Sequence, residues 1–344
     1  MLFVLLQAAL ATATPLRARD DGATAFASNS GGNLKLSSID APVKGDGTPG
    51  DSTWKLSIDD SQSGFRQKIT GFGAAVTDAT VSSFSGLSSD KLDALIKEMM
   101  TPDGADFALM RHTIGASDLS GDPVYTYDDN DNNADTDLKN FGIGDRGGAM
   151  ADLLAKMKTA QSDLKILGSP WSAPGWMKLN GVIDGNTDKN NLNDGFTTHD
   201  GDGYSSAFAD YFVKYIQAFK DKGVPVDAIT LQNEPLNSQA GYPTMYMFAE
   251  EQATLVQNFV GPALQKAGLD TKVWAYDHNT GMWQRNSYTE FLLTIMQISP
   301  IIPRQFSTKP ASSSTPLLGT AMPRMLTGRY SLTSRPRTTR FSST

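Results

Sequence analysis

The chain has 344 residues, a formal net charge of −7 at pH 7, and hydrophobic and charged contents of 39% and 19%. These proportions are typical of a globular protein that can bury a sizeable core, and the acidic balance argues against a nucleic-acid partner. The chain contains no cysteine, which excludes disulfides, thiol nucleophiles and thiolate metal sites but leaves the cellular compartment open.

Residues 1–17 are predicted to be a signal peptide. The run 2–13 is apolar and offers two small-residue cleavage patterns, at 9–11 and 11–13, although no Lys or Arg precedes it. The run is too short to remain as a membrane anchor, and no later segment is apolar over a bilayer's width. We therefore expect a secreted, extracellular protein without a transmembrane segment; the alternative is an apolar start with no targeting role.

Strand and helix patterns alternate from about residue 69 to 290, after β-hairpin patterns over 33–68. The predicted strands are 68–76, 107–111, 164–168, 226–231 and 272–276, and the predicted helices are 89–100, 147–163, 204–221 and 244–267. The helix at 204–221 has the strongest pattern, one apolar stripe of Phe208, Tyr211, Phe212, Tyr215, Ile216 and Phe219. Repeated βα units predict parallel strands with right-handed crossovers, but a closed (β/α)₈ barrel needs eight strands.

The composition changes abruptly near residue 290. Residues 291–344 contain no Asp or Glu, hold seven of the 30 basic residues, and are rich in Ser, Thr and Pro. Such a segment cannot bury enough apolar surface to offset its chain entropy, so a disordered tail is predicted. Two origins fit this tail, a genuine basic linker and an out-of-frame translation, and the abruptness of the change favours the second.

Polar and aromatic residues follow the predicted strands, where parallel α/β folds collect their reactive groups. They are Arg111, His112 and Asp118 after the second strand, Trp171 and Trp176 after the third, Asn233 and Glu234 after the fourth, and Asp277, His278 and Asn279 after the fifth. Glu234 is the strongest signal, because a carboxylate at the end of a buried strand is costly without partners or a task. It fits a glycosidase proton donor beside an Asn that binds the sugar 2-hydroxyl, or a structural carboxylate before a proline.

The other candidates also have two interpretations each. Trp171 and Trp176 are either packing aromatics or flat platforms for a sugar ring. Arg111 and Asp118 are either a simple ion pair or a pair that binds hydroxyl groups. His112 should point away from the site and pack, and His278 is either a buried structural histidine or a site residue.

Neither a metal nor a cofactor is expected. The three histidines show no ligand spacing, and the acidic run 125–137 lacks the Gly and closing Glu of an EF-hand loop. We interpret this run as a solvated loop. No phosphate-binding glycine motif opens a helix.

Taken together, these strings resemble glycoside hydrolase family 30, especially the fungal endo-β-1,6-glucanases and more distantly the glucosylceramidases. The matching segments are ITGFGAAVTDA (69–79), MRHTIGASDLS (110–120), GSPWSAPGWMK (168–178), YFVKYIQAFKDKGVPVDAITLQNEP (211–235) and KVWAYDHN (272–279). The resemblance implies a (β/α)₈ TIM barrel with a β-rich side domain, and retaining hydrolysis of β-glucosidic bonds. It also implies that Glu234 is the acid/base and Asn233 the 2-hydroxyl partner, with Arg111, Asp118, Trp171 and His278 lining the subsite of the cleaved sugar; Trp176 is kept as a second sugar platform.

The predicted organisation is a signal peptide at 1–17, strands of the side domain at 24–68, an incomplete barrel of about five βα units at 69–290, and the disordered tail at 291–344. The family's nucleophile is a Glu after the seventh strand, whereas this chain has no acidic residue beyond Glu290. A retaining mechanism needs two carboxyl groups. The polypeptide as written is therefore expected to be inactive. The alternatives are action on glucosylceramide and a non-catalytic glucan-binding remnant; the oligomeric state stays open.

Overall fold

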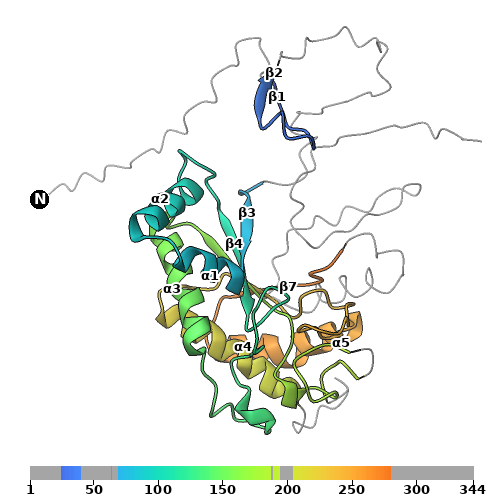
Figure 1. The fold of residues 1–344 in the computed structure, drawn as a ribbon. Coiled ribbons are helices and arrows are strands. Elements are labelled where there is room, and N and C mark those ends of the chain that lie inside the picture. The colour runs from blue at the N-terminus through green and yellow to red at the C-terminus, as the bar shows by residue number, and fades with distance from the viewer. Residues whose placement is uncertain (1–24, 40–62, 64–68, 187–188, 194–203, 280–344) are drawn as a thin grey trace, which may run out of the picture. The chain divides into compact units, whose positions relative to one another are not determined.

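The computed structural model describes residues 25–39, 63, 69–186, 189–193 and 204–279 (Figure 1). Its strands are β1 Ala25–Ala27, β2 Ser37–Ile39, β3 Gly73–Val76, β4 Leu109–Ile114, β5 Lys165–Pro170, β6 Ala228–Thr230 and β7 Lys272–Trp274. Its helices are α1 Asp78–Ser85, α2 Ser89–Met100, α3 Gly144–Ala160, α4 Tyr204–Asp221, α5 Ala249–Leu255 and α6 Gly261–Lys266, with short turns η1 Asn130–Asn132, η2 Gly175–Met177 and η3 Val256–Val260.

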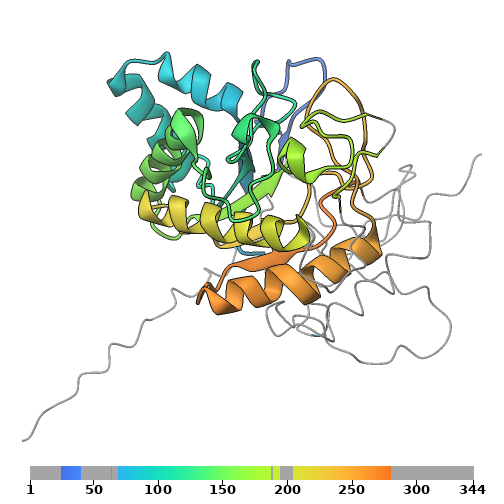
Figure 2. The same ribbon diagram turned by 90° about the horizontal axis from the view of Figure 1, so that it is seen from below.

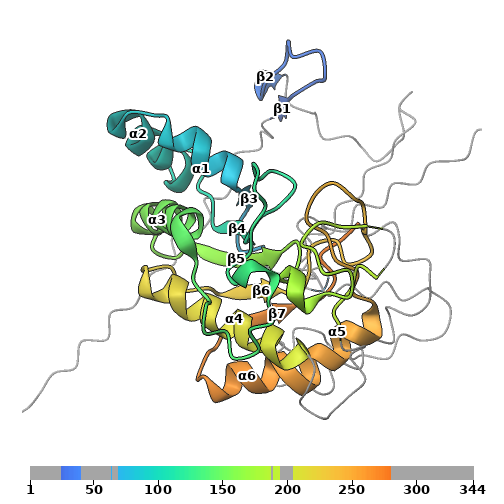
Figure 3. The ribbon, with the colours of Figure 1, turned by 60° about the horizontal axis from the view of Figure 1, so that its bottom comes forward.

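Strands β3 to β7 form one parallel sheet in which the spatial order equals the chain order. Helices follow the strands and form an arc along the outer side of the sheet (Figure 3). Sequential parallel strands with helices outside are the arrangement of a (β/α) barrel, and the described residues contain five of its eight strands. The α/β fold and the incomplete barrel expected from the sequence are confirmed.

Helix α4 supplies much of the core beneath the sheet. All six residues of its predicted apolar stripe are buried, and the helix has the predicted bounds, Tyr204–Asp221. Helix α4 also contacts η3 and α6, which run beside it (Figure 2). Gly168 on β5 faces Tyr215 so closely that an added Cβ would lie 2.2 Å from the tyrosine oxygen. The glycine in the third strand is thus required by the helix that covers it.

The structure corrects two helix predictions. Helix α1 was not predicted, because its sequence DATVSSFS has little helical propensity; Thr77 and Thr80 start it through a reciprocal capping box. The predicted helix 244–267 begins five residues later, at Ala249, and contains the π-helical turn η3. Pro262 follows directly and has no N–H to donate to the preceding turn, which accounts for the widened hydrogen bonding there.

The acidic run 125–137 is only in part the solvated loop expected: residues 131–134 are exposed, whereas residues 126–128 are buried. Tyr127 and Asp128 are each 2% exposed, and Tyr127 stacks against Tyr211 of α4. Burial, and then the neighbouring Asp135 and Asp129, raise the pKa of Asp128 to about 6. The two tyrosines of YTYDD place this part of the run in the core, which the number of acidic residues did not indicate.

Strands β1 and β2 form a separate antiparallel pair, with Phe26 opposite Ser38. The predicted signal peptide at 1–17, most of the hairpin region 40–68 and the predicted tail 291–344 lie outside the described residues. Within the described part, no helix has both the length and the apolar character that crossing a membrane requires.

Candidate active site

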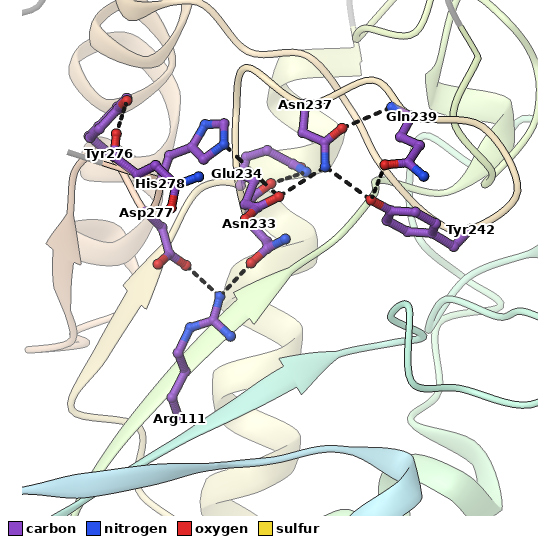
Figure 4. A network of polar contacts seen from close by, with 11 residues as sticks. Arg111, Asn233, Glu234, Asn237, Gln239, Tyr242, Tyr276, Asp277 and His278 are labelled. Carbon is purple, nitrogen blue, oxygen red and sulfur yellow. Dashed lines mark hydrogen bonds and ion pairs between the residues drawn. The ribbon is translucent and has the colours of Figure 1, made fainter. Parts of the chain in front are cut away.

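Arg111, at the middle of β4, is the hub of the polar network at the strand ends (Figure 4). Its Nη2 donates to Asn233 Oδ1 at 2.7 Å and to Asp277 Oδ2 at 2.6 Å. The side chains of Arg111 and Asp277 are 22% and 17% exposed. A partly buried charged pair of this kind is held strongly in place, because water competes little for either partner.

Asp277 is the site residue whose role the sequence did not reveal. Besides Arg111, its Oδ2 accepts from Ser169 Oγ at 2.9 Å and Thr230 Oγ1 at 3.2 Å. The chain around it is joined to the Glu234 segment, since the Glu234 N–H donates to the Asp277 carbonyl at 2.8 Å. Its place directly after the fifth strand was the available signal.

Glu234, which follows β6, has an unusual backbone conformation and a partly exposed side chain. Its φ of 43° lies in the left-handed region, which a residue with a Cβ adopts only when its surroundings enforce it. The side chain is 39% exposed, and its Oε2 accepts from Asn237 Nδ2 at 2.9 Å and lies 4.0 Å from His278 Nε2. Strain at a half-exposed carboxylate points to function more than to packing.

His278 lies beside this carboxylate and is largely buried, with 6% of its side chain exposed. Its Nδ1 has no hydrogen-bond partner among the described residues. The role of His278 stays a prediction, and its ring lies beside the Glu234 carboxylate in the network shown in Figure 4.

The two tryptophans of GSPWSAPGWMK differ. The Arg111 guanidinium lies 4.8 Å from the ring centroid of Trp171, which places this indole at the site. Trp176 is 5% exposed, belongs to the hydrophobic core and donates its Nε1–H to the Asp128 carbonyl at 2.8 Å. The expected sugar platform at Trp176 is thus corrected to a packing role, because its faces are taken up by the protein.

The predicted pairing of Arg111 with Asp118 is also corrected. Arg111 pairs with Asp277, and Asp118 is exposed on the loop after β4. Asp78 anchors that loop, because its Oδ2 accepts hydrogen bonds from Ser120 Oγ at 2.7 Å and from Arg146 Nη2 at 2.6 Å. Asp118 therefore sits on an anchored loop, and its contact with a sugar stays a prediction.

His112 packs away from the site, as expected from its alternation with Arg111. It is fully buried, stacked on Phe219, and its Nδ1 lies 3.0 Å from the Thr113 carbonyl. A carbonyl only accepts, so Nδ1 carries the hydrogen and Nε2 accepts from Tyr215 Oη at 2.6 Å. Burial lowers the pKa of His112 to about 3, which keeps the ring neutral.

Lys178 joins the loop after β5 to the loop after β6. The residue is 2% exposed, and its Nζ donates to Ser172 Oγ at 3.0 Å and to the carbonyls of Ile183 and Thr244 at 2.8 and 3.0 Å. Burial lowers the pKa of Lys178 to about 7, and Asp184 opposes this shift. One side chain thus ties together the segments that carry Trp171 and Glu234.

No three His, Asp or Glu side chains converge as metal ligands within the described ranges. The site instead combines a half-exposed carboxyl group with an Arg–Asp pair, an Asn amide, a histidine and an indole. That set suits the transfer of one proton beside a ligand rich in hydroxyl groups.

Comparisons with known proteins show which family the chain matches. Residues 69–297 match the glycosyl hydrolase family 30 TIM-barrel domain. The chain is 66% identical over 281 residues to an endo-1,6-β-D-glucanase of Trichoderma harzianum, covering 80% of this chain and 57% of that protein. A second endo-1,6-β-D-glucanase, of Aspergillus fumigatus, is also 66% identical, over 76% of this chain and 54% of its own length.

More distant relatives share the fold. The lysosomal acid glucosylceramidase of Mus musculus is 31% identical over 61% of this chain and 40% of its own length. The solved endo-β1,6-glucanase BT3312 superposes with a TM-score of 0.60 at 27% identity, covering 80% of this chain and 56% of that one. The chain spans just over half the length of the fungal relatives and belongs to glycosyl hydrolase family 30.

Proposed function

We propose that this chain is the catalytic-domain portion of a secreted endo-β-1,6-glucanase in which Glu234 is the proton donor. The observation that carries the proposal is Glu234 itself, half-exposed and conformationally strained at the end of β6, within the Arg111–Asn233–Asp277 network. The 66% identity to two fungal endo-1,6-β-D-glucanases supports β-1,6-glucan as the substrate. The 31% identity to a glucosylceramidase supports the lipid substrate less.

Each site residue has a role in this proposal. Glu234 donates a proton to the glycosidic oxygen of the leaving sugar. Asn233 uses its Oδ1 to accept from Arg111, so its amide hydrogens remain for the sugar 2-hydroxyl. Arg111, Asp118 and His278 bind further hydroxyl groups, and Trp171 packs against the sugar ring.

Hydrolysis of the glucan by this polypeptide depends on a second catalytic carboxyl group. A retaining glycosidase needs a second carboxyl group about 5–5.5 Å from the first, acting as nucleophile. Asp277, the other carboxylate of the site, is held by Arg111, Ser169 and Thr230, and such donors stabilise the anion and weaken its attack. We propose that the 344-residue polypeptide binds β-1,6-glucan without hydrolysing it, and that the activity belongs to a protein carrying the nucleophile.

The test uses the purified 344-residue chain with linear β-1,6-glucan, and β-1,3-glucan as the matched control. Calorimetry should show binding of the β-1,6-linked polymer only, with no release of reducing ends. Glucosylceramide vesicles provide the competing arm, and preferential binding there would replace the glucan proposal. Hydrolysis abolished by Glu234→Gln would contradict the proposed inactivity while supporting the assigned proton donor. Binding of none of the three ligands would refute the function.

Secretion is tested separately. Expression of the chain in a fungal host should place the protein in the medium, with its N-terminus created by cleavage near residue 17. Retention of the intact N-terminus inside the cell would contradict this part of the proposal.

A further inference from the structure

The turn after β6 brings Asn237 onto the carboxyl group of Glu234. The backbone N–H of Asn237 donates to the Glu234 carbonyl at 2.8 Å, which closes a four-residue turn with Pro235 at its second position. Proline favours that position because its ring fixes φ near the value required there. In this turn the Asn237 Nδ2 lies 2.9 Å from Glu234 Oε2 (Figure 4).

The orientation of the Asn237 amide is fixed by its other contacts. Its Oδ1 accepts from the backbone N–H of Gln239 at 2.9 Å, a bond that an exchanged NH₂ group could not form. The Nδ2 therefore faces Glu234, and it also donates to Tyr242 Oη at 3.0 Å. Tyr242 Oη in turn donates to Gln239 Oε1 at 3.4 Å, so one amide hydrogen of Asn237 points to the carboxylate and the other starts a chain of hydrogen bonds that runs away from it.

We propose that Asn237 is a positioning residue that reserves Glu234 Oε2 as a permanent acceptor and leaves Oε1 as the oxygen that carries the transferable proton. Of the two oxygens of a protonated carboxyl group, the carbonyl oxygen is the stronger acceptor, so the hydrogen bond from Asn237 to Oε2 favours protonation on Oε1. His278 Nε2, at 4.0 Å, is on the Oε2 side as well. The inference rests on the proposed role of Glu234 as proton donor, and it assigns the direction from which the proton leaves.

The contact also has an electrostatic consequence. A hydrogen bond donated to the carboxyl group favours its ionised form, and a nearby negative charge disfavours it. Asn237→Asp replaces the donating Nδ2 by a negatively charged oxygen at nearly the same place. Asn237→Ala removes the donor without adding a charge. Both changes should make the Glu234 carboxyl group hold its proton to higher pH, the first more than the second.

The titration of the Glu234 carboxyl group can be followed by NMR, because the chain contains only five glutamates, at 98, 234, 250, 251 and 290. Glutamate labelled with ¹³C at the carboxyl carbon gives five signals, and loss of one in Glu234→Gln assigns that of Glu234. In Asn237→Asp its titration midpoint should move up by about one pH unit or more, the usual effect of an adjacent like charge. Gln217→Asp, on the exposed side of α4, adds the same charge without adding a glutamate signal and should leave the midpoint unchanged.

Equal midpoints in the parent, Asn237→Asp and Asn237→Ala proteins would overturn the proposal. If these variants fail to fold, the parent protein still decides the matter. The side-chain ¹⁵N signal of Asn237 should shift with the Glu234 midpoint and lose that dependence in Glu234→Gln; an amide insensitive to pH across this range would refute the contact. No glucan is present, so failure to bind or cleave glucan would contradict the proposed function and leave this result standing.

Discussion

Arg111 and Asp277 lie 166 residues apart in the chain, yet the Arg111 Nη2 is 2.6 Å from Asp277 Oδ2. The pair links the second and fifth strands of the sheet across the site, and the same Nη2 also holds the Asn233 side chain. The position of Asn233 therefore depends on an interaction that closes only when the sheet is complete through β7.

Replacing Arg111 should separate binding from stability. Arg111→Ala leaves the Asp277 carboxylate without its counter-charge and should lower the free energy of unfolding by about 1–3 kcal/mol, less than for a fully buried pair because both groups are partly exposed. Arg111→Lys keeps the charge but loses the planar guanidinium over Trp171, so glucan affinity should fall more than stability. Urea unfolding and calorimetry measure the two effects, and an Arg111→Lys protein with parental affinity would contradict the assignment.

The two tryptophans should differ in their effect on glucan binding. Trp171→Ala should abolish glucan binding and also lower stability, since this ring lies at the site and is itself only 7% exposed. Trp176→Ala should cost about 3–5 kcal/mol of unfolding free energy, because it empties a buried position and leaves the Asp128 carbonyl without its donor. A Trp176 variant that stays fully stable but loses glucan would restore the sugar-platform interpretation.

Gly168 offers a matched pair of glycine substitutions. Gly168→Ala drives a methyl group into Tyr215 Oη and should destabilise the fold by about 1–3 kcal/mol. Gly148→Ala, on α3 with nothing within 4 Å of the new Cβ, should stabilise it by about 0.5–1 kcal/mol through helix propensity. Tyr215→Phe removes the clashing oxygen but also the hydrogen bond to His112, so the double variant Gly168→Ala/Tyr215→Phe should lose less stability than the sum of the two single variants. Strictly additive losses would show that the clash lies elsewhere.

The buried His112 should make the protein sensitive to acid. Burial holds its folded-state pKa at about 3, below the ordinary value near 6.5, so only the unfolded chain binds a proton between these values. The stability tied to His112 is complete above about pH 6.5 and is lost as the pH falls toward 3, by up to about 1.4 kcal/mol per pH unit. Urea unfolding at pH 7 and pH 5 should show a smaller drop for His112→Gln than for the parent.

Lys178 is expected to be structural rather than chemical. Lys178→Met keeps the side chain as far as Cε but leaves the carbonyls of Ile183 and Thr244 without their shared donor. The unfolding free energy should fall by about 2–4 kcal/mol, the sum of two or more unmet acceptors. Limited proteolysis should then cut the loop after β6 faster, whereas an unchanged cleavage rate would argue that this loop is held by other contacts.

The alternation of strands and helices followed from the sequence because these patterns are local. The stripe on α4 fixed both the bounds of the helix and the face it buries. The positions of Arg111, Trp171 and Glu234 after successive strands indicated one end of a parallel sheet. Only helices with weak local signals, such as α1 with its Ser- and Thr-rich sequence, were missed.

Partner choice was decided by the tertiary structure alone. Asp118 stands seven residues from Arg111 and was the natural partner by sequence, but the register that pairs Asn233 with Asp277 brings the distant carboxylate into reach instead. Asp128 was likewise assigned to the surface by its residue type, and Trp176 was left open between packing and sugar binding; the packing of the loops placed both inside. Sequence periodicity specifies which face of an element is apolar, whereas the identity of a neighbour depends on how elements far apart in the chain are placed against one another.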